Sequence, residues 1–319
     1  MSARASSPRV VTFGETMALF RAREVGSLRH AADVVLGIGG AESNVAIGLS
    51  RLGVDVGWLG RVGDDSLGER VLREIRAEGI EVRGILDHEA RTGLMVKERP
   101  APASSAVHYY RGGSAGSRLE PDDIPPGWIE EAAVLHVTGI TALLSESARA
   151  CLMAAIARGR AAGVLISFDV NYRSALAPPE VAGPLLRAVA DEADLVFGGA
   201  DELRLLRPGA ADPVQELRDG GVGEVVLKRG AHGASVFHSG RTEHIDGLRV
   251  DVVDTVGAGD AFVAGYLSGL IEALDVAARL ERANICGALA CTVPGDWEAA
   301  PMRREVARFG RQDVDPVAR

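Results

Sequence analysis

The sequence predicts an α/β fold in which a doubly wound, mainly parallel sheet is flanked by helices and carries a small β-sheet lid. Short apolar runs alternate with helix-length segments along most of the 319 residues, as in chains built from β-α units. Two segments, about 18–38 and 92–112, interrupt this alternation and predict the lid. We therefore expect a single domain over residues 1–319, with the lid attached to the helix-covered sheet.

The strands and helices of the larger sheet follow from the apolar runs. In the first quarter of the chain the predicted order is strand, helix, strand, helix, at residues 9–14, 43–52, 55–62 and 66–78. Gly53 and Gly79 follow the two helices, and glycine readily adopts the left-handed conformation that ends a helix. Later runs predict strands at 133–139, 164–169, 194–198 and 224–230, and helices at 145–162, 258–271 and 275–291.

The expected lid contains a predicted β-hairpin. The runs TGLMVKE (92–98) and AVHYYR (106–111) lie on either side of a turn that contains Pro100 and Pro102, which is typical of two antiparallel strands. Exposed strand edges and an apolar lid face often pair with a second subunit. We therefore expect a homodimer formed through the lid.

The composition excludes several classes of protein. The net charge is -9, whereas a nucleic-acid-binding domain usually carries a basic patch, so we expect no nucleic-acid partner. No stretch approaches the length of apolar sequence that spans a membrane, and we expect a cytoplasmic protein. Lysine is nearly absent, so most cationic contacts fall to arginine. The three cysteines lack metal-ligand spacing and are predicted to be buried thiols: Cys151, Cys286 and Cys291.

The most informative motif is DTVGAGDAF at 254–262, which follows an apparent strand at 248–253 and precedes an apolar helix. The small residues at 257–259 allow the backbone to approach a ligand closely. The N-terminus of the following helix presents unpaired N–H groups and the positive end of the helix dipole, which favour an anion. Asp260 lies at this point and can take a proton from an attacking hydroxyl. The alternative is a glycine-rich turn in which Asp260 only caps the helix.

A second motif, GGAESNVA at 39–46, also precedes a predicted helix. Its paired glycines allow backbone contact with a polyhydroxyl ligand, and Asn44 can both donate and accept hydrogen bonds. A small-molecule site between this motif and DTVGAGDAF is therefore the expectation.

Together the two motifs resemble the N-terminal and C-terminal signatures of the pfkB (ribokinase-like) family of carbohydrate kinases. They lie about 200 residues apart in the family's order, and the resemblance runs from about residue 9 to 305. It implies the ribokinase-like fold and ATP-dependent phosphorylation of a sugar hydroxyl. It also implies that Asp260 is the general base and that the backbone of Gly257, Ala258 and Gly259 forms an anion hole for the γ-phosphoryl group.

The resemblance places the nucleotide on the C-terminal half of the chain. The segment KRGAHGA at 228–234 matches a K-x-G-x-x-G segment that lines the nucleotide in the family, and a plain hairpin turn is the alternative. Asn284 lies in an otherwise apolar helix and needs a partner, either the ligand or a structural hydrogen bond. The residues implied in ATP binding are Asn171, Arg173, Lys228, Gly230, Gly233, Gly257, Gly259 and Asn284.

In addition to ATP, the resemblance implies two metal ions, Mg²⁺ and K⁺. Glu202 matches the glutamate of the family's N-x-x-E motif, which acts on Mg²⁺ through water, but Gly199 replaces the asparagine of that motif. The alternative role for Glu202 is stabilisation of a helix N-terminus by its charge. K⁺ dependence is common in the family, so K⁺ is a further candidate cofactor. Asp254 would either orient the anion-hole loop or lie near that cation.

Two arginine-containing strings narrow the expected substrate. YYR at 109–111 belongs to the lid, and NYR at 171–173 follows a predicted strand, where ligands bind in open α/β sheets. Guanidinium groups pair bidentately with carboxylates, so Arg111 and Arg173 favour an anionic sugar.

These strings, with GGAESN, look like those of 2-keto-3-deoxygluconate kinases. The substrate contacts that this resemblance implies are Gly40, Ala41, Asn44, Met95, Tyr109, Tyr110, Arg111, Arg173, Asp260 and Asp296. Met95 departs from the subfamily, which often has an aromatic residue after TGL.

Other interpretations stay open at the level of sequence. The chain could be a kinase for a neutral sugar or nucleoside, such as fructose or ribose, or a catalytically silent sugar-binding regulator on the same fold. The intact GAGD at 257–260 argues against the regulator, which has no need of a base. Arg111 could instead form a salt bridge on the lid surface, and Arg173 could be the partner of Asp169.

Overall fold

The computed structural model describes residues 9–101 and 104–309 and confirms the predicted α/β fold. The strands of the larger sheet are β1 (Arg9–Phe13), β4 (Asp55–Gly63), β5 (Glu81–Asp87), β8 (Val134–Thr138), β9 (Leu165–Asp169), β10 (Leu195–Gly199), β11 (Glu224–Lys228), β12 (Ala234–His238) and β13 (Arg241–Ile245). Their order is β13-β12-β11-β10-β9-β8-β1-β4-β5. The strands from β11 to β5 pair in parallel, and β12 and β13 add an antiparallel edge.

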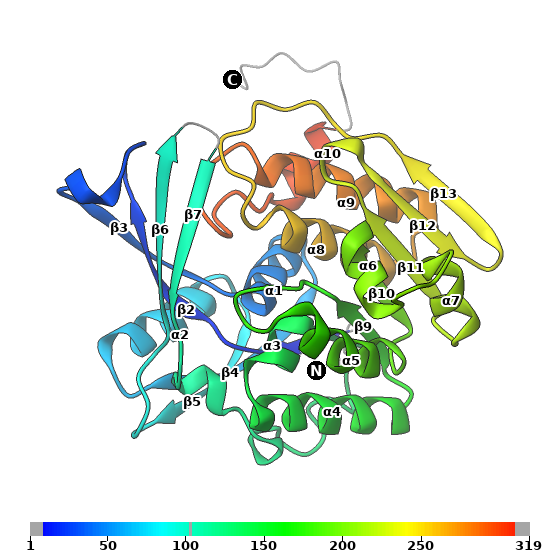
Figure 1. The fold of residues 1–319 in the computed structure, drawn as a ribbon, viewed down its shortest axis with the longest axis horizontal. Coiled ribbons are helices and arrows are strands. Elements are labelled where there is room, and N and C mark those ends of the chain that lie inside the picture. The colour runs from blue at the N-terminus through cyan, green and yellow to red at the C-terminus, as the bar shows by residue number, and fades with distance from the viewer. Residues whose placement is uncertain (1–8, 102–103, 310–319) are drawn as a thin grey trace, which may run out of the picture.

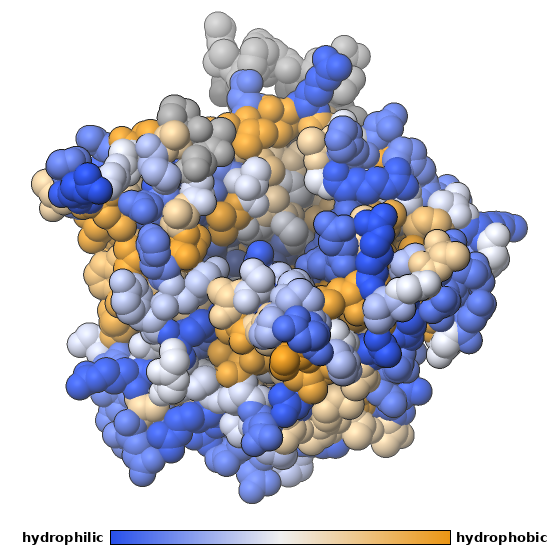
Figure 2. Space-filling view, viewed as in Figure 1, coloured by the Kyte–Doolittle hydropathy of each residue, from blue (hydrophilic) through white to orange (hydrophobic). Residues whose placement is uncertain are grey.

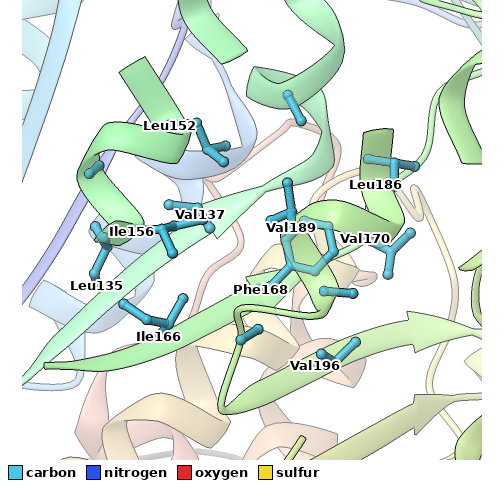
Figure 3. Close-up of a cluster of buried hydrophobic side chains, with 14 of the residues drawn as sticks. Leu135, Val137, Leu152, Ile156, Ile166, Phe168, Val170, Leu186, Val189 and Val196 are labelled. Carbon is cyan, nitrogen blue, oxygen red and sulfur yellow. The ribbon is translucent and has the colours of Figure 1, made fainter. Parts of the chain in front are cut away.

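Helices cover both faces of this sheet, as a doubly wound fold requires (Figure 1). They are α1 (Ala41–Arg51), α2 (Ser66–Ala77), α3 (Gly139–Leu144), α4 (Glu146–Ala161), α5 (Pro179–Ala190), α6 (Ala200–Leu206), α7 (Pro213–Asp219), α8 (Ala258–Ile271), α9 (Val276–Ala290) and α10 (Arg303–Phe309). One core packs the central strands against α4 and α5, where Phe168 of β9 lies among Ile156, Leu186 and Val189 (Figure 3). The other core packs the opposite face against α1, α2, α8 and α9.

The strand order also locates the cleft. From β1 the chain runs outward to β4 and β5, and it then returns to the other side of β1 to form β8, β9, β10 and β11. The crossover direction therefore changes between β1 and β8. In open α/β sheets ligands bind outside the carboxyl ends of the strands at such a point. Asp169 and Lys228 stand at the carboxyl ends of β9 and β11.

The predicted lid is a separate four-stranded sheet in the order β3-β2-β6-β7. Its strands are β2 (Met17–Ala22), β3 (Val34–Gly39), β6 (Leu94–Ala101) and β7 (Ser104–Tyr110). The predicted antiparallel pairing of β6 with β7 is confirmed, although Pro102 of their turn lies outside the described residues. The lid stands beside the body of the molecule, on the left in Figure 1.

Most of the predicted elements are confirmed within a few residues, but the strand expected at 248–253 is wrong. That segment forms no strand. Where it ends, the N–H groups of Val253 and of the following Asp254 donate to the carbonyl of Cys291, just after α9. Cys151 and Cys286 are buried free thiols, as predicted, and Cys291 is only partly buried. Among the described helices, none is long and apolar enough to cross a membrane.

Candidate active site

The N-terminus of α8 faces the cleft, and Gly257 sets its position. Gly257 has a left-handed backbone, with φ 78°, and a Cβ at this position would lie 1.7 Å from the carbonyl oxygen of Asp296. Only glycine combines this conformation with so close an approach. Most of α8 is buried, so the helix holds its first turn, and with it the N–H groups and dipole that attract an anion, in one place.

Asp260 lies in that first turn, beside two other polar side chains. Asn44 Nδ2, on α1, donates to Asp260 Oδ2 at 2.8 Å and to Asp296 Oδ2 at 3.2 Å. Asn171 Nδ2 lies 3.5 Å from Asp260 Oδ1. The structure therefore brings Asn44 together with Asp260 and Asp296, which lie 216 and 252 residues further along the chain.

The electrostatics of this cluster suit a base that works near neutral pH. Burial raises the pKa of Asp260 to about 7, with a further contribution from the negative charge of Asp296. Burial also raises the pKa of Asp296 to about 6, although the bond from Asn44 opposes the shift. A carboxylate with a pKa close to the working pH is the favourable choice for general base catalysis.

A first cavity extends from Asp260 toward the ends of β9 and β11. It is lined in part by Asn171, Arg173, Glu202, Lys228, Gly257 and Gly259. Lys228 Nζ contacts both carboxylate oxygens of Asp169, at 2.7 and 2.8 Å. Burial alone would lower the pKa of Lys228, but Asp169 and Glu202 outweigh it and raise the pKa. The partner of Asp169 is thus Lys228. The alternative in which Arg173 pairs with Asp169 is not observed.

Glu202 lies in the same cavity and also caps α6. Its carboxylate accepts hydrogen bonds from the N–H groups of Tyr172, at 2.9 Å, and Gly199, at 2.7 Å. In the described part of the chain no three His, Cys, Asp or Glu side chains converge as a metal cage. Mg²⁺ commonly keeps several waters and uses one or two carboxylates plus the phosphates of a nucleotide. The carboxylates of Asp169 and Glu202 fit that mode, whereas a dedicated protein cage does not exist among these residues.

A second cavity lies under the lid and meets the first at Gly257, Asp260 and Arg173. Figure 2 shows the corresponding recess at the centre of this face, between the lid and the body. Nine of the ten predicted substrate contacts line it: Gly40, Ala41, Asn44, Met95, Tyr109, Arg111, Arg173, Asp260 and Asp296. Tyr110 does not line this cavity. Successive side chains of a strand point to opposite faces, and Tyr110 is 65% exposed in an outer groove.

Arg111 reaches this cavity from the end of the lid, and it is already paired. Its Nη2 lies 2.5 Å from Glu15 Oε2 and its Nε donates to the same oxygen at 2.7 Å. Glu15 is 2% exposed and also accepts a hydrogen bond from Ser114. The alternative of a salt bridge is therefore present, but it lies inside the cavity and not on the lid surface. Glu15 could not be predicted as a site residue, because nothing in the local sequence pattern links it to residue 111.

Three residues predicted to bind the nucleotide line neither cavity. Gly230 and Gly233 form the turn between β11 and β12, and both have left-handed backbones. Asn284 Nδ2 donates to the carbonyl of Asp246 at 2.9 Å, which is the structural hydrogen bond considered for it. Their roles in ATP binding stay predictions.

Comparison with known proteins adds three findings. A family model described as "pfkB family carbohydrate kinase" matches residues 7–303. The chain is 39% identical over 309 residues to a 2-dehydro-3-deoxygluconokinase of Bacillus subtilis (strain 168), covering 94% of each chain. It is 36% identical over 310 residues to a 2-dehydro-3-deoxygluconokinase of Thermoproteus tenax, covering 93% of this chain and 92% of that one.

A solved structure is similar over nearly the whole chain. It is that of a ribokinase II candidate from E. coli in complex with ATP and Mg²⁺, with a TM-score of 0.89 and 25% sequence identity. The match covers 96% of this chain and 99% of that one. The ribokinase-like fold expected from the two motifs is therefore confirmed.

Proposed function

Because the chain belongs to the pfkB family of carbohydrate kinases, we propose that it transfers the γ-phosphoryl group of ATP to the terminal hydroxyl of 2-keto-3-deoxygluconate, also called 2-dehydro-3-deoxygluconate. The product is the 6-phosphate. The relatives at 39% and 36% identity carry this activity in their names, and they support the same substrate here.

The observation that carries the proposal is the meeting of two cavities at the start of α8. One cavity contains Lys228 and the other contains Arg111, and both are lined by Gly257 and Asp260. A phosphoryl donor in the first and an acceptor hydroxyl in the second would meet at the helix N-terminus. Transfer of a phosphoryl group needs this positioning together with electrostatic stabilisation, and little covalent chemistry from the protein.

In the proposed reaction Asp260 takes the proton of the terminal hydroxyl. The hydroxyl oxygen forms a bond to the γ-phosphorus while the bond from that phosphorus to the bridging oxygen of ATP breaks, and ADP leaves. N–H groups at 257–260 stabilise the negative charge on the transferring group. Arg173, which lines both cavities, is placed to contact either the phosphoryl group or the substrate carboxylate. Closure of the lid excludes water and limits hydrolysis of ATP.

Mg²⁺ is the expected companion of ATP, and Glu202 and Asp169 are the residues that would hold it through water. It would neutralise charge on the phosphates. The complex of ATP and Mg²⁺ in the similar E. coli structure supports the use of these two together. K⁺ is implied only by the family resemblance, and it is not part of this proposal.

The substrate carboxylate is assigned to the arginines of the lid cavity. Arg111 Nε and Nη2 both contact Glu15 Oε2, so one edge of the guanidinium is occupied and its remaining donors are held in a fixed orientation. Such a group can recognise a carboxylate by geometry as well as by charge. Arg173 supplies a second positive charge to the same cavity.

Replacing Arg111 by glutamine tests this assignment. The amide can still donate to Glu15, which keeps that buried carboxylate hydrogen-bonded. We expect kcat/KM for 2-keto-3-deoxygluconate to fall about 10–100-fold, since a hydrogen bond to a charged group contributes about 1.5–3 kcal/mol. Turnover of any neutral sugar, such as fructose, should change much less. ADP release measured with both sugars on one preparation gives the ratio.

The matched control is Arg118→Gln. Arg118 pairs with Asp87 and Glu89 at the surface and lines neither cavity, so both sugars should be turned over as by the unmodified chain. An equal loss for the sugar acid and the neutral sugar in Arg111→Gln would contradict the carboxylate contact and favour a neutral-sugar kinase.

The pH profile offers a test of the two carboxylates. Because Asp260 must be ionised to act as a base, kcat/KM should fall as the pH drops below about 7, the pKa of this buried group. Asp296→Asn removes a negative charge that raises this pKa, so the acid limb should move to lower pH. Rates measured from pH 5 to 9 locate the acid limb. If the limb of Asp296→Asn does not move, the charge of Asp296 does not raise the pKa of Asp260.

The proposed assembly is a homodimer formed through the lid. Val34 and Tyr110 are exposed on the two edge strands of the lid, β3 and β7, and an exposed strand edge can pair with a second chain. Light scattering at micromolar concentration should give twice the chain mass of 33.4 kDa. A monomeric mass would end this part of the proposal.

A further inference from the structure

The two lysines of the chain occupy special positions. Among 35 lysine and arginine residues, only Lys97 and Lys228 are lysines. Both pair with an aspartate beside the candidate site, Lys228 with Asp169 and Lys97 with Asp254. A chain that uses arginine for almost every cationic side chain thus keeps an ammonium group at these two places. Lys228 belongs to the nucleotide side, whereas the proposed mechanism gives Lys97 no role.

Lys97 lies on lid strand β6 and is removed from water. The side chains of Lys97 and Asp254 are each 1% exposed, with Nζ 2.5 Å from Asp254 Oδ2. Nζ also donates to the carbonyl of Gly295 at 2.8 Å. An ammonium is a compact donor that fits between these oxygens, whereas a guanidinium is larger and planar. Loss of one partner would leave a buried charge unpaired.

The contacts of Lys97 lead to the anion hole along two routes. On the first, Asp254 Oδ1 accepts a hydrogen bond from the N–H of Val256 at 3.3 Å, directly before Gly257. On the second, Gly295 precedes Asp296 in the chain. The carbonyl of Asp296 packs against Gly257, as described above. Both segments that fix the position of Gly257 therefore converge on the same ammonium group.

Other lid residues reach the same segment. Arg99 Nη2, also on β6, donates to the carbonyl of Val253 at 3.1 Å. Ser105 Oγ, on β7, lies 3.4 Å from Asp254 Oδ1. In Figure 1 the yellow segment that leads into α8 passes beside the ends of β6 and β7. The lid and the loop before α8 are therefore joined directly, with Lys97 as the buried centre of the junction.

We propose that Lys97 is a positioning residue whose ammonium acts as a built-in cation, holding the Asp254 loop and thereby the anion hole in place under the lid. The inference rests on the proposed kinase function. Because Asp254 already has a buried counterion, the enzyme needs no added monovalent cation at this point. Replacing K⁺ by tetramethylammonium should leave wild-type turnover unchanged, and a K⁺ requirement in the wild-type enzyme would contradict the proposal.

Two substitutions separate positioning from simple stabilisation. Lys97→Met removes the charge but fills the space, and Lys97→Ala leaves a void between a carboxylate and a carbonyl. In both variants kcat should fall about 10–100-fold, as expected for displacement of groups that hold the transferring atom, while KM for the sugar acid changes little. K⁺ or NH₄⁺ should then raise kcat of Lys97→Ala in a saturable manner and leave Lys97→Met unaffected.

Melting temperatures measured beside the rates show whether each variant is folded. Wild-type kcat in both folded variants would overturn the proposal. An identical response of Lys97→Ala and Lys97→Met to added cations would overturn it as well.

A measurement that needs no substrate distinguishes failure of this inference from failure of the proposed function. With two lysines in the chain, acylation by an amine-reactive reagent followed by peptide mapping reports on Lys97 individually. Lys97 should react far more slowly in the folded protein than in urea. Labelling of Lys97 at the rate of an exposed amine would show that the junction is open in solution, whatever sugar the enzyme phosphorylates.

Discussion

Replacing Asp260 by asparagine is expected to lower kcat about 10²–10⁴-fold, the usual range for loss of a positioned general base. The amide keeps the size of the carboxylate and can still meet Asn44, which donates to Asp260 at 2.8 Å. ATP affinity, measured by calorimetry without the sugar, should change little. A near-wild-type kcat would remove Asp260 from the mechanism.

The same substitution should make the protein more stable at alkaline pH. The pKa of Asp260 is raised in the folded state, from 3.8 to about 7, so the folded protein binds this proton more tightly than the unfolded chain does. The stabilisation is complete below pH 3.8 and is lost as the pH rises through 7. At pH 8 the ionised carboxylate therefore costs on the order of 1–4 kcal/mol, since one pKa unit corresponds to about 1.4 kcal/mol.

Asparagine avoids this cost at every pH. The melting temperature of Asp260→Asn should exceed that of the wild type at pH 8, and the difference should shrink toward pH 5. A gain at pH 8 with loss of activity is the combination expected of a base held in an unfavourable environment for function. If Asp260→Asn and the wild type melt at the same temperature at pH 8 and also at pH 5, that result would contradict the raised pKa of Asp260.

Gly257→Ala is expected to have the second largest effect. A Cβ at this position would lie 1.7 Å from the carbonyl oxygen of Asp296, so the backbone must shift. The left-handed φ of 78° adds strain of about 1–3 kcal/mol for a residue other than glycine. Because the displaced N–H groups are those of the anion hole, kcat should fall about 10²–10³-fold.

The matched control is Gly163→Ala. Gly163 has nearly the same conformation, with φ 76°, and a Cβ there would meet nothing within 4 Å. It lies after α4, away from both cavities. This control should lose some stability and keep its kcat. If both alanine variants keep wild-type kcat at saturating ATP and sugar, the position of Gly257 is not critical for transfer.

The fold could be predicted from the sequence because its signals are local. Apolar runs and glycine-ended helices mark β1, α1, β4 and α2 within a few residues of where they lie. The segment 248–253 has an apolar pattern of the same kind but forms no strand, and the N–H of Val253 at its end donates to the carbonyl of Cys291. That contact depends on a helix end about 40 residues away, which no local pattern contains.

The candidate site is likewise only partly predictable from local sequence. Gly257, Asp260 and Asn44 lie in short motifs, and the chemistry of those motifs indicates an anion and a base. The two buried ion pairs could not be found in this way. Glu15 and Arg111 are 96 residues apart in the chain, and Lys97 and Asp254 are 157 apart. Each pair forms because a buried charge needs an opposite charge beside it, and local sequence does not show which residue supplies that charge. The scarcity of lysine is the one feature of the sequence that draws attention to Lys97.

Direct identification of the product tests the central proposal. The wild-type enzyme, incubated with MgATP and 2-keto-3-deoxygluconate, should release ADP and form one phosphate monoester in equal amount, with ³¹P NMR placing the phosphate on the terminal carbon. Fructose and ribose under the same conditions should give far less product. Formation of fructose or ribose phosphate, with no ester from the sugar acid, would contradict the account.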